Sequence, residues 1–177
     1  EVLDYNSTIG NKYIICPAPT RELITGGTAD DWMSFADKLN EIGAKVKARG
    51  MQFGYHNHSW EFKKFNGQYA LDILFSRTDP SNVVAEIDLG WTFNAGVDPI
   101  SYFTKYKGRC PLVHIKDFKK GGPQTEVGTG DLDLAGINAA APDVGVEWYI
   151  IETEEYNMAP RESVKLGLDN LKAVIQG

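Results

Sequence analysis

Side chains that can bind a metal ion or move a proton recur in this sequence wherever a short apolar run stops. Each of the chain's 3 histidines lies at such a position. If the runs are parallel strands, their carboxyl ends meet at one edge of a sheet, so the polar groups converge there. The polar residues that end successive runs are His56 and His58, then Glu86 and Asp88, then His114, Lys116 and Asp117, and finally Glu152 and Glu154.

The side chains at these ends suit a divalent metal ion of intermediate hardness, such as Mn²⁺, Zn²⁺ or Co²⁺. A purely structural zinc site normally uses cysteine, which is absent from these ends. Taken singly, a histidine after a strand is usually hydrogen-bonded in the core, and an aspartate usually caps a helix. Their recurrence at successive strand ends favours a metal site of His56, Asp88, His114 and Glu152.

Five apolar runs are the predicted strands that position these groups. They are apolar throughout rather than alternating, which indicates a parallel sheet buried on both faces. Helical patterns separate them, which predicts an α/β fold and leaves a doubly wound sheet and a barrel both open. The predicted strands are Tyr13–Cys16, Met51–His56, Val83–Leu89, Pro111–Ile115 and Trp148–Ile151.

The helices between the strands carry start and stop signals. Thr28 and Asp31 form a capping-box pattern ahead of apolar residues at helical spacing. Asp98 followed by Pro99 gives an N-cap with proline at the first helical position. Further helices are predicted over 71–75, 132–140 and 164–175, with Gly50 and Gly108 as stop signals.

The composition describes a globular protein with no nucleic-acid or membrane partner. The chain has 177 residues, enough for one domain, and its net charge of -6 argues against a nucleic-acid surface. No run approaches the ~18 apolar residues of a membrane span. Cys16 and Cys110 are interpreted as buried free thiols. No signal peptide opens the chain, but it begins at Glu1 and not at Met, so only the default expectation of a cytoplasmic location stands.

A set of short segments, spread over nearly the whole chain, adds a second line of inference. They are Phe53–Phe62, Glu86–Trp91, Ala95–Pro99, Gly108-Arg109, Val113–Asp117, Val127–Gly130 and Ile151-Glu152. In order and approximate spacing they resemble the sugar phosphate isomerase/epimerase family, a branch of the xylose isomerase-like TIM-barrel superfamily. Each segment is weak alone, but the ordered set is specific.

The resemblance implies a TIM (β/α)8 barrel with one divalent metal ion, Mn²⁺, Mg²⁺, Co²⁺ or Zn²⁺. The family's ligands are often Glu, Asp, His and Glu, and the last three fall on Asp88, His114 and Glu152. The first falls near His56, where many relatives have Glu. The implied reaction is the isomerisation or epimerisation of a small sugar, keto-sugar or sugar phosphate, by proton abstraction alpha to a carbonyl through an enediolate.

The resemblance also implies roles for the catalytic residues. Glu152 is expected to act as ligand and as acid/base group, and His56 as ligand or base. Lys116 either stabilises an oxyanion or forms a structural ion pair with Glu86 or Asp117.

The remaining polar and aromatic groups are assigned to the substrate or to the framework. His58, Trp91 and Glu154 are expected to contact the sugar, although packing is at least as good an explanation for Trp91 and for Trp60. The glycine-rich segment 121–130 lacks the lysine and spacing of a phosphate loop, so it is interpreted as a plain flexible connection.

Other functions of the same superfamily compete with this one. A related lyase, resembling 3-dehydroshikimate or inosose dehydratase, would use the same metal and base. A non-catalytic sugar-binding remnant is the third candidate. A hydrolase resembling endonuclease IV is disfavoured, because that family uses several metal ions and many more histidines than the 3 present here.

The length indicates an incomplete barrel. A complete TIM barrel has eight strands and typically ~250 residues, whereas the strands predicted here resemble the last five. We therefore expect 1–177 to be a single barrel domain that lacks its N-terminal βα units and belongs to a longer protein. Such a chain would expose apolar residues near Ile14, Val84 and Val113 and tend to self-associate, and homo-oligomerisation stays open.

Overall fold

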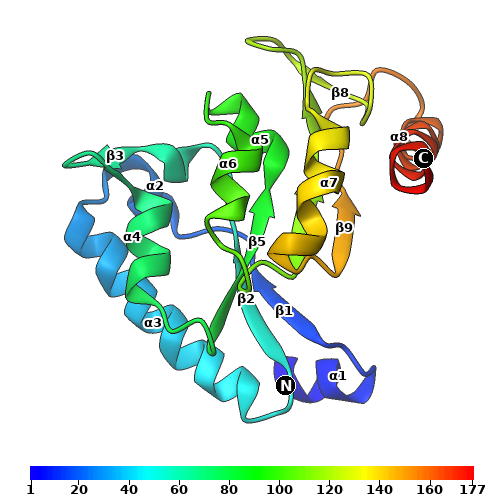
Figure 1. Ribbon diagram of the computed structural model, residues 1–177. Coiled ribbons are helices and arrows are strands. Elements are labelled where there is room, and N and C mark those ends of the chain that lie inside the picture. Colours follow the sequence, from blue (N-terminus) through cyan, green and yellow to red (C-terminus); the bar gives the residue numbers. More distant parts are fainter. The chain divides into compact units, whose positions relative to one another are not determined.

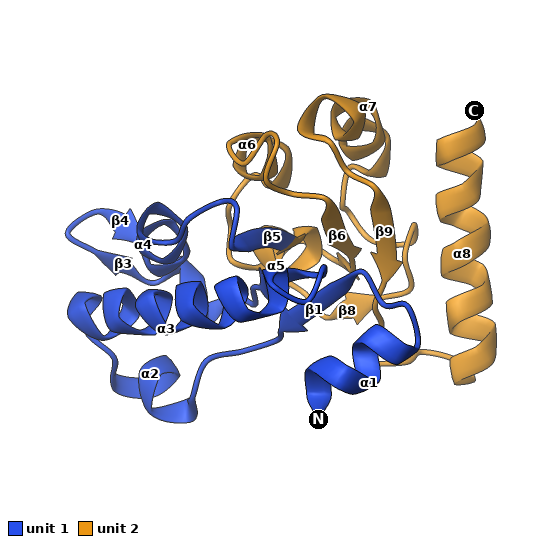
Figure 2. Ribbon diagram, turned by 90° about the horizontal axis from the view of Figure 1, so that it is seen from below, with its two compact units in different colours: residues 1–86 blue, residues 87–177 orange.

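The computed structural model describes residues 1–177, which form two compact units. The first unit is Glu1–Glu86 and the second is Ile87–Gly177, drawn in different colours in Figure 2. Strand β5 (Val83–Asp88) begins in the first unit and ends in the second with Ile87 and Asp88. No helix in the chain combines the length and apolar character that crossing a lipid bilayer requires.

The first unit contains the parallel strands β1 (Tyr13–Cys16), β2 (Gln52–His56) and β5, in the order of the chain (Figure 1). The register places His56 of β2 opposite Glu86 of β5, so the polar ends of these strands lie at one level. The other elements are α1 (Val2–Thr8), α2 (Arg21–Gly26), α3 (Ala29–Lys47), η1 (Trp60–Phe62), β3 (Lys64–Phe65), β4 (Gln68–Tyr69) and α4 (Ala70–Arg77).

Helix α3 begins where its capping box predicts. The Thr28 side chain accepts a hydrogen bond from the Asp31 amide at 3.2 Å, and the Asp31 carboxylate accepts one from the Thr28 amide at 2.9 Å. The two bonds satisfy orphan donors at the helix start. The helix packs against β2 and α4 through the buried side chains of Trp32 and Leu39.

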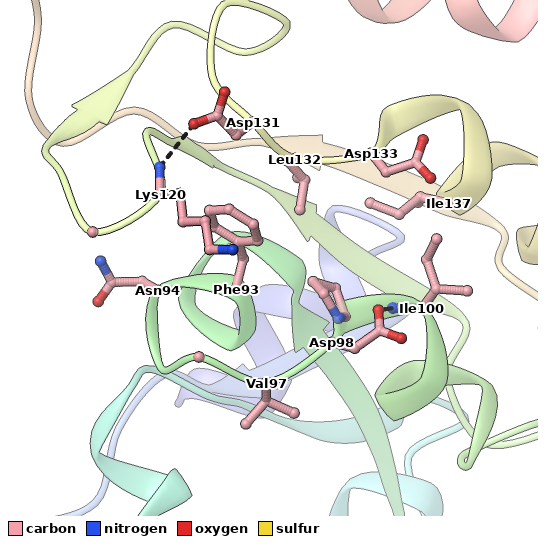
Figure 3. Close-up of a pocket in the computed structure, with 13 residues that line it drawn as sticks. Phe93, Asn94, Val97, Asp98, Ile100, Lys120, Asp131, Leu132, Asp133 and Ile137 are labelled. Carbon is pink, nitrogen blue, oxygen red and sulfur yellow. Dashed lines mark hydrogen bonds between the residues drawn. The ribbon is translucent and has the colours of Figure 1, made fainter.

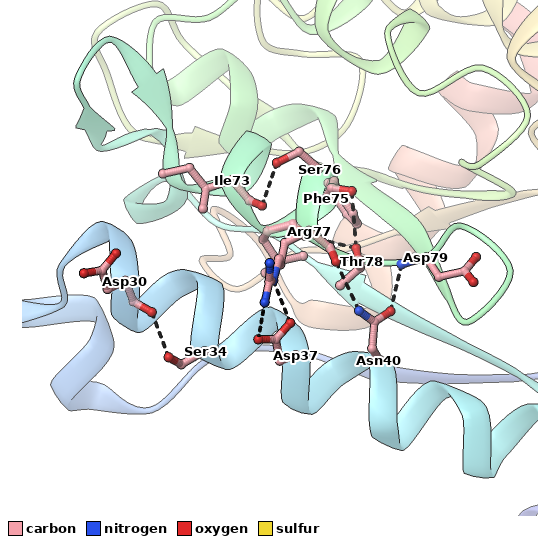
Figure 4. A network of polar contacts seen from close by, with 11 residues as sticks. Asp30, Ser34, Asp37, Asn40, Ile73, Phe75, Ser76, Arg77, Thr78 and Asp79 are labelled. Carbon is pink, nitrogen blue, oxygen red and sulfur yellow. Dashed lines mark hydrogen bonds and ion pairs between the residues drawn. The ribbon is translucent and has the colours of Figure 1, made fainter.

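Polar contacts fasten the turn after α4 to α3 (Figure 4). Arg77 donates two hydrogen bonds to Asp37, at 2.7 and 2.9 Å, and Asn40 both donates to the Arg77 carbonyl and accepts from the Asp79 amide. These groups are exposed, where an ion pair contributes only about 0–1 kcal/mol. Burial of apolar side chains from both helices therefore carries most of the stabilisation here.

The second unit contains the parallel pair β6 (Leu112–Ile115) and β9 (Trp148–Ile151), with Ile115 opposite Ile151. Strand β6 is almost wholly buried, as a strand with a continuous apolar run should be. The other elements are α5 (Leu89–Asn94), α6 (Pro99–Thr104), β7 (Asp117–Phe118), β8 (Gln124–Thr125), α7 (Leu134–Val144) and α8 (Pro160–Gln176).

The predicted alternation of parallel strands and helices is confirmed. All five predicted strands are present with bounds that differ by a residue at most, and both cysteines are free thiols. Cys110 is buried, whereas Cys16 is only half-buried. The helices that begin after Thr28 and Asp98 are present as well, and each cap donates or accepts as its pattern predicts.

Several elements differ from the sequence prediction. The short helices α1, α2 and α5 and the hairpins β3–β4 and β7–β8 were not predicted. Burial on both faces is wrong for β1 and β9, whose residues are half-buried or, for Trp148, exposed. Ile14 and Val84 are half-buried, but the expected exposure near Val113 is wrong, because that side chain is fully buried in β6.

Candidate metal centre

Three of the predicted ligands converge in the second unit. Asp88, His114 and Glu152 each offer one ligand atom, and these atoms lie within 4.8 Å of one another. The Nδ1 atom of His114 lies 3.1 Å from Oε2 of Glu152. The strand register explains this proximity, because β6 pairs with β9 up to Ile115 and Ile151, and the Glu152 amide continues the ladder by donating to the Ile115 carbonyl.

Asp88 is a helix cap and a buried carboxylate at once. Its Oδ1 accepts a hydrogen bond of 2.7 Å from the Trp91 amide and so caps α5. The residue is completely buried, and this burial raises the pKa of its carboxyl to about 8, although the Trp91 bond and the charges of Lys116 and His114 lower it in part. Capping uses one oxygen of Asp88, and a cation beside the other would oppose the effect of burial.

Glu152 has the opposite electrostatic surroundings. Burial alone would raise the pKa of this carboxyl, but hydrogen bonds from His114 and Lys116 outweigh it and hold the pKa well below its ordinary range. Lys116 Nζ lies 3.0 Å from Glu152 Oε2 and donates a bond of 2.8 Å to Glu154 Oε2. The fully buried ammonium of Lys116 therefore joins two predicted site residues, while Asp117, considered above as its partner, binds backbone amides.

Lys116 is enclosed by aromatic and backbone groups. Its ammonium lies 4.5 Å from the centre of the Trp91 ring, which also packs on Phe118 at 5.2 Å. A cation over an indole face is a favourable electrostatic contact. Helix α5 approaches closely enough that a Cβ atom at Gly90 would lie 2.1 Å from the Lys116 carbonyl oxygen. Trp91 thus packs against the framework of the site, one of the two roles considered for it.

His56 and His58 belong to the first unit. His56 Nδ1 lies 3.6 Å from Glu86 Oε2, and both side chains are buried. The rings of His56 and His58 meet edge to face at 4.9 Å, and His58 stacks on Trp60 with centroids 4.2 Å apart. Glu86 therefore contacts the imidazole of His56, in the position of a group that orients a ligand.

The sequence interpretation gave no role to Glu61, a completely buried carboxylate beside these rings. Burial raises the pKa of Glu61 to about 7, and hydrogen bonds from the Tyr55 hydroxyl and the His58 amide lower it only in part. These bonds measure 2.6 and 2.9 Å. They fix the segment after β2 from which His58 projects. The signal in the sequence was a glutamate inside an aromatic run, Trp60 to Phe62.

The glycine-rich segment 121–130 binds the protein's own carboxylate. Oδ2 of Asp117 accepts hydrogen bonds from the amides of Gly128 and Gly130, both at 2.9 Å. Oδ1 accepts from the amides of Phe118 and Leu132, at 2.9 and 3.1 Å. These amides are directed at Asp117, which agrees with the interpretation of the segment as a connection without a phosphate site.

A cavity of about 590 Å³ lies elsewhere in the second unit (Figure 3). Apolar side chains including Phe93, Ile100 and Ile137 line it. Its carboxylates have structural partners, since Asp98 and Asp133 cap helices α6 and α7, and Asp131 accepts from the Lys120 amide. None of the predicted site residues lines this cavity.

The donor set of the second unit fits a divalent metal ion. Two carboxylates and one imidazole within ligand distance of one another match Mn²⁺, Co²⁺ or Zn²⁺. The complete burial of Asp88 supports the same conclusion, because a buried carboxylate needs a cation or strong donors to stay ionised. Lys116 supplies part of that charge and is shared with Glu152 and Glu154.

Comparison with known proteins places the chain in a family. A family profile described as "Xylose isomerase-like TIM barrel" matches residues 1–174. The inosose dehydratase of Lacticaseibacillus casei is 29% identical over 147 residues, covering 72% of this chain and 49% of that protein. The inosose dehydratase of Clostridium beijerinckii is 27% identical over 164 residues, covering 77% and 54%. The chain thus spans about half the length of the curated relatives it matches.

Solved structures agree on the fold. A sugar phosphate isomerase/epimerase from Parabacteroides distasonis superposes with a TM-score of 0.81 at 26% identity, covering 98% of this chain and 60% of that one. A structure of IOLI protein with a bound zinc atom gives a TM-score of 0.75 at 17% identity, covering 99% and 66%. At that identity the second similarity concerns the fold alone. Of the two architectures left open by the strand pattern, the family match identifies a partial TIM barrel.

Proposed function

Because the chain belongs to the xylose isomerase-like TIM-barrel family, we propose that it provides the metal-binding part of an enzyme that isomerises or epimerises a small sugar, keto-sugar or sugar phosphate. The observation that carries the proposal is the cluster of Asp88, His114 and Glu152 beside the buried ammonium of Lys116. The names of solved relatives support an isomerase or epimerase.

In this proposal Asp88, His114 and Glu152 hold one divalent ion, Mn²⁺, Mg²⁺, Co²⁺ or Zn²⁺, and His56 is the fourth ligand. Such an ion polarises a carbonyl and so acidifies the neighbouring C–H bond. Each of the four side chains ends a parallel strand, where TIM-barrel enzymes place their active sites. His56 is preorganised for the role by its contact with Glu86.

The protein's own groups then supply the proton chemistry. Glu152, held ionised by Lys116 and His114, takes the proton alpha to the carbonyl and returns it to the product. Lys116 lies beside it and stabilises the negative charge that develops on oxygen. His58, Trp91 and Glu154 are the proposed substrate contacts, with Trp91 acting through the ring that also packs on Lys116.

A lyase is the second candidate. The curated relatives named above are inosose dehydratases, and elimination of water from a keto-polyol begins with the same proton abstraction. The two reactions differ in what leaves, since the isomerase keeps every atom and the lyase releases water. Product analysis of a full-length enzyme on a panel of ketoses and inososes separates them by mass.

The test common to both candidates is exchange of the abstracted proton. With full-length enzyme, metal and the best sugar of the panel, turnover in D₂O should place deuterium at the carbon alpha to the carbonyl. Glu152→Gln keeps the side-chain shape but removes the basic oxygen, so exchange should fall by at least roughly 10²–10⁴-fold. Glu155→Gln, an exposed carboxylate of the same segment, is the matched control and should exchange like the wild type.

A companion variant resolves the role of His56. If His56→Ala loses activity that excess Mn²⁺ restores, the imidazole is a ligand; unrestored loss with normal metal content makes it a base. Near-wild-type exchange in Glu152→Gln would show that the acid/base assignment is wrong.

A further inference from the structure

The segment that carries Glu152 and Glu154 has no regular structure of its own. Strand β9 ends at Ile151 and helix α8 begins at Pro160. The intervening residues, 152–159, contribute no helix or strand hydrogen bonds beyond the Glu152 amide. Groups elsewhere in the chain must therefore fix the two carboxylates, because irregular segments are otherwise mobile.

Buried side chains in and after β8 supply that support. Gln124 accepts a hydrogen bond from the Glu154 amide at 3.4 Å. Glu126, also buried, accepts from the Asn157 amide at 2.9 Å and from the Asn157 side chain at 3.1 Å, one oxygen to each. A carboxylate that accepts two bonds from one residue restrains both its backbone and its side chain.

The segment that carries Gln124 and Glu126 is itself fixed at its other end. The buried Asp117 binds the amides of Gly128, Gly130 and Leu132. The fit is tight, since a Cβ atom at Gly130 would lie 2.0 Å from an oxygen of Asp117. From α8, the Asn170 side chain donates a bond of 2.8 Å to the Val127 carbonyl.

We infer that Asp117 and Glu126 are positioning residues of this site: together they hold residues 152–157 so that Glu152 and Glu154 meet the Lys116 ammonium. The inference rests on the proposed function for its catalytic consequence. Its structural half stands on the hydrogen bonds alone. Neither residue touches a predicted ligand through its side chain in these contacts, so each acts through the backbone that it binds.

The structural half is tested by hydrogen exchange. Glu126→Gln replaces one acceptor oxygen with an amide that cannot accept the Asn157 bonds as a carboxylate does. Amide exchange of residues 153–158 in the metal-free full chain should become about tenfold faster or more. Glu155→Gln makes the same charge change within the segment and should leave exchange unchanged once intrinsic rates are subtracted. Unchanged exchange in Glu126→Gln would overturn the inference.

The functional half is tested by zinc titration and by turnover of the full-length enzyme. In Glu126→Gln we expect Zn²⁺ affinity or kcat to fall roughly 10–100-fold, as for other groups that orient ligands. Asn157→Ala should give a smaller loss, and the double variant no more than Glu126→Gln alone, because both changes break one connection. Additive losses, or faster exchange with unaltered affinity and kcat, would overturn the positioning role.

A milder variant covers the case in which Glu126→Gln fails to fold. Gly130→Ala pushes a methyl group against Asp117 without removing a charge, and it should speed exchange of 153–158 in the same direction. If no sugar is turned over even by the wild type, the proposed function fails, while the exchange and zinc measurements still decide the positioning role.

Discussion

Glu61 in the first unit and Glu152 in the second are the same residue type in opposite electrostatic states. Burial raises the pKa of both. Around Glu61 the donors are neutral, the Tyr55 hydroxyl and the His58 amide, and the pKa rises to about 7. Around Glu152 the donors are the Lys116 ammonium and His114, and the pKa falls well below its ordinary value. The presence of a cation, and not the degree of burial, decides the charge of each carboxyl.

The difference separates a framework group from a candidate ligand. Glu61 accepts bonds that order the segment after β2, a task it can perform at either charge with some rearrangement of the Tyr55 hydroxyl. Glu152 must be an anion to bind a metal or accept a proton, and its neighbours keep it so over the whole physiological range.

The comparison breaks most strongly if Lys116 loses its charge. Lys116→Met keeps much of the buried volume but leaves Glu152 and Glu154 side by side without their cation. Removing one partner of a buried ion pair costs about 3–5 kcal/mol. Both carboxylates are partly exposed, so we expect the lower end, about 3 kcal/mol, in urea unfolding at neutral pH.

Lys119→Met is the control for this loss. Its half-exposed side chain pairs with Asp131 at 3.6 Å, a surface contact that contributes about 0–1 kcal/mol. Equal losses in the two lysine variants would contradict the special place given to Lys116.

A second test asks whether Glu61 titrates as a buried acid. Its pKa is raised in the folded state from 4.5 to about 7, so the proton it holds stabilises the fold fully below pH ~4.5. That contribution, up to about 3 kcal/mol, is lost as the pH rises through 7. In Glu61→Gln the amide can accept from His58 and donate to Tyr55 at every pH.

Unfolding curves measured from pH ~4.5 to 8 should therefore show the wild type losing up to about 3 kcal/mol relative to Glu61→Gln. Taking the difference between the two proteins removes the contribution of Asp88, whose raised pKa acts in the same direction. Parallel curves would mean that Glu61 is ionised in the folded protein at all these pH values.

A third test sharpens the comparison with a metal as the added cation. Burial raises the pKa of Asp88 to about 8, so Zn²⁺ must displace a proton from it at lower pH. Apparent Zn²⁺ affinity should rise about tenfold per pH unit below 8, or about 1.4 kcal/mol per unit, and level off above it. Calorimetric titration measures this, and Glu61→Gln should show the same slope because Glu61 lies outside the ligand set. A flat profile would remove Asp88 from the set.

Much of the fold follows from local signals. The capping box of Thr28 and Asp31 starts α3 because its bonds are closed within one turn. Strand β9 has the predicted bounds, Trp148–Ile151, because its apolar run is bounded by polar residues. Helix α5 was missed because Asp88 was assigned to a strand end and a metal, and its bond to the Trp91 amide, which starts the helix, looks the same in sequence.

The candidate site was predictable in its ligands and not in its support. Asp88, His114 and Glu152 end strands that the apolar pattern marks, so their proximity follows from the fold class. Glu126 and its partner Asn157 are 31 residues apart, and no periodicity joins them. Glu61 was missed because one glutamate in an aromatic run carries no sign of its burial. Interactions across such distances depend on tertiary packing, which the pattern of single residues does not encode.

Gly90 has a consequence for how natural variants of this protein are interpreted. Any side chain there would press on the Lys116 carbonyl, 2.1 Å from the first carbon added, and so displace the ammonium that serves two carboxylates. A survey of tolerated substitutions would then rank Gly90 with the residues that perform chemistry, although it has no functional group. At such a position intolerance measures the space between two backbones, and reaction chemistry has to be read from the side chains they carry.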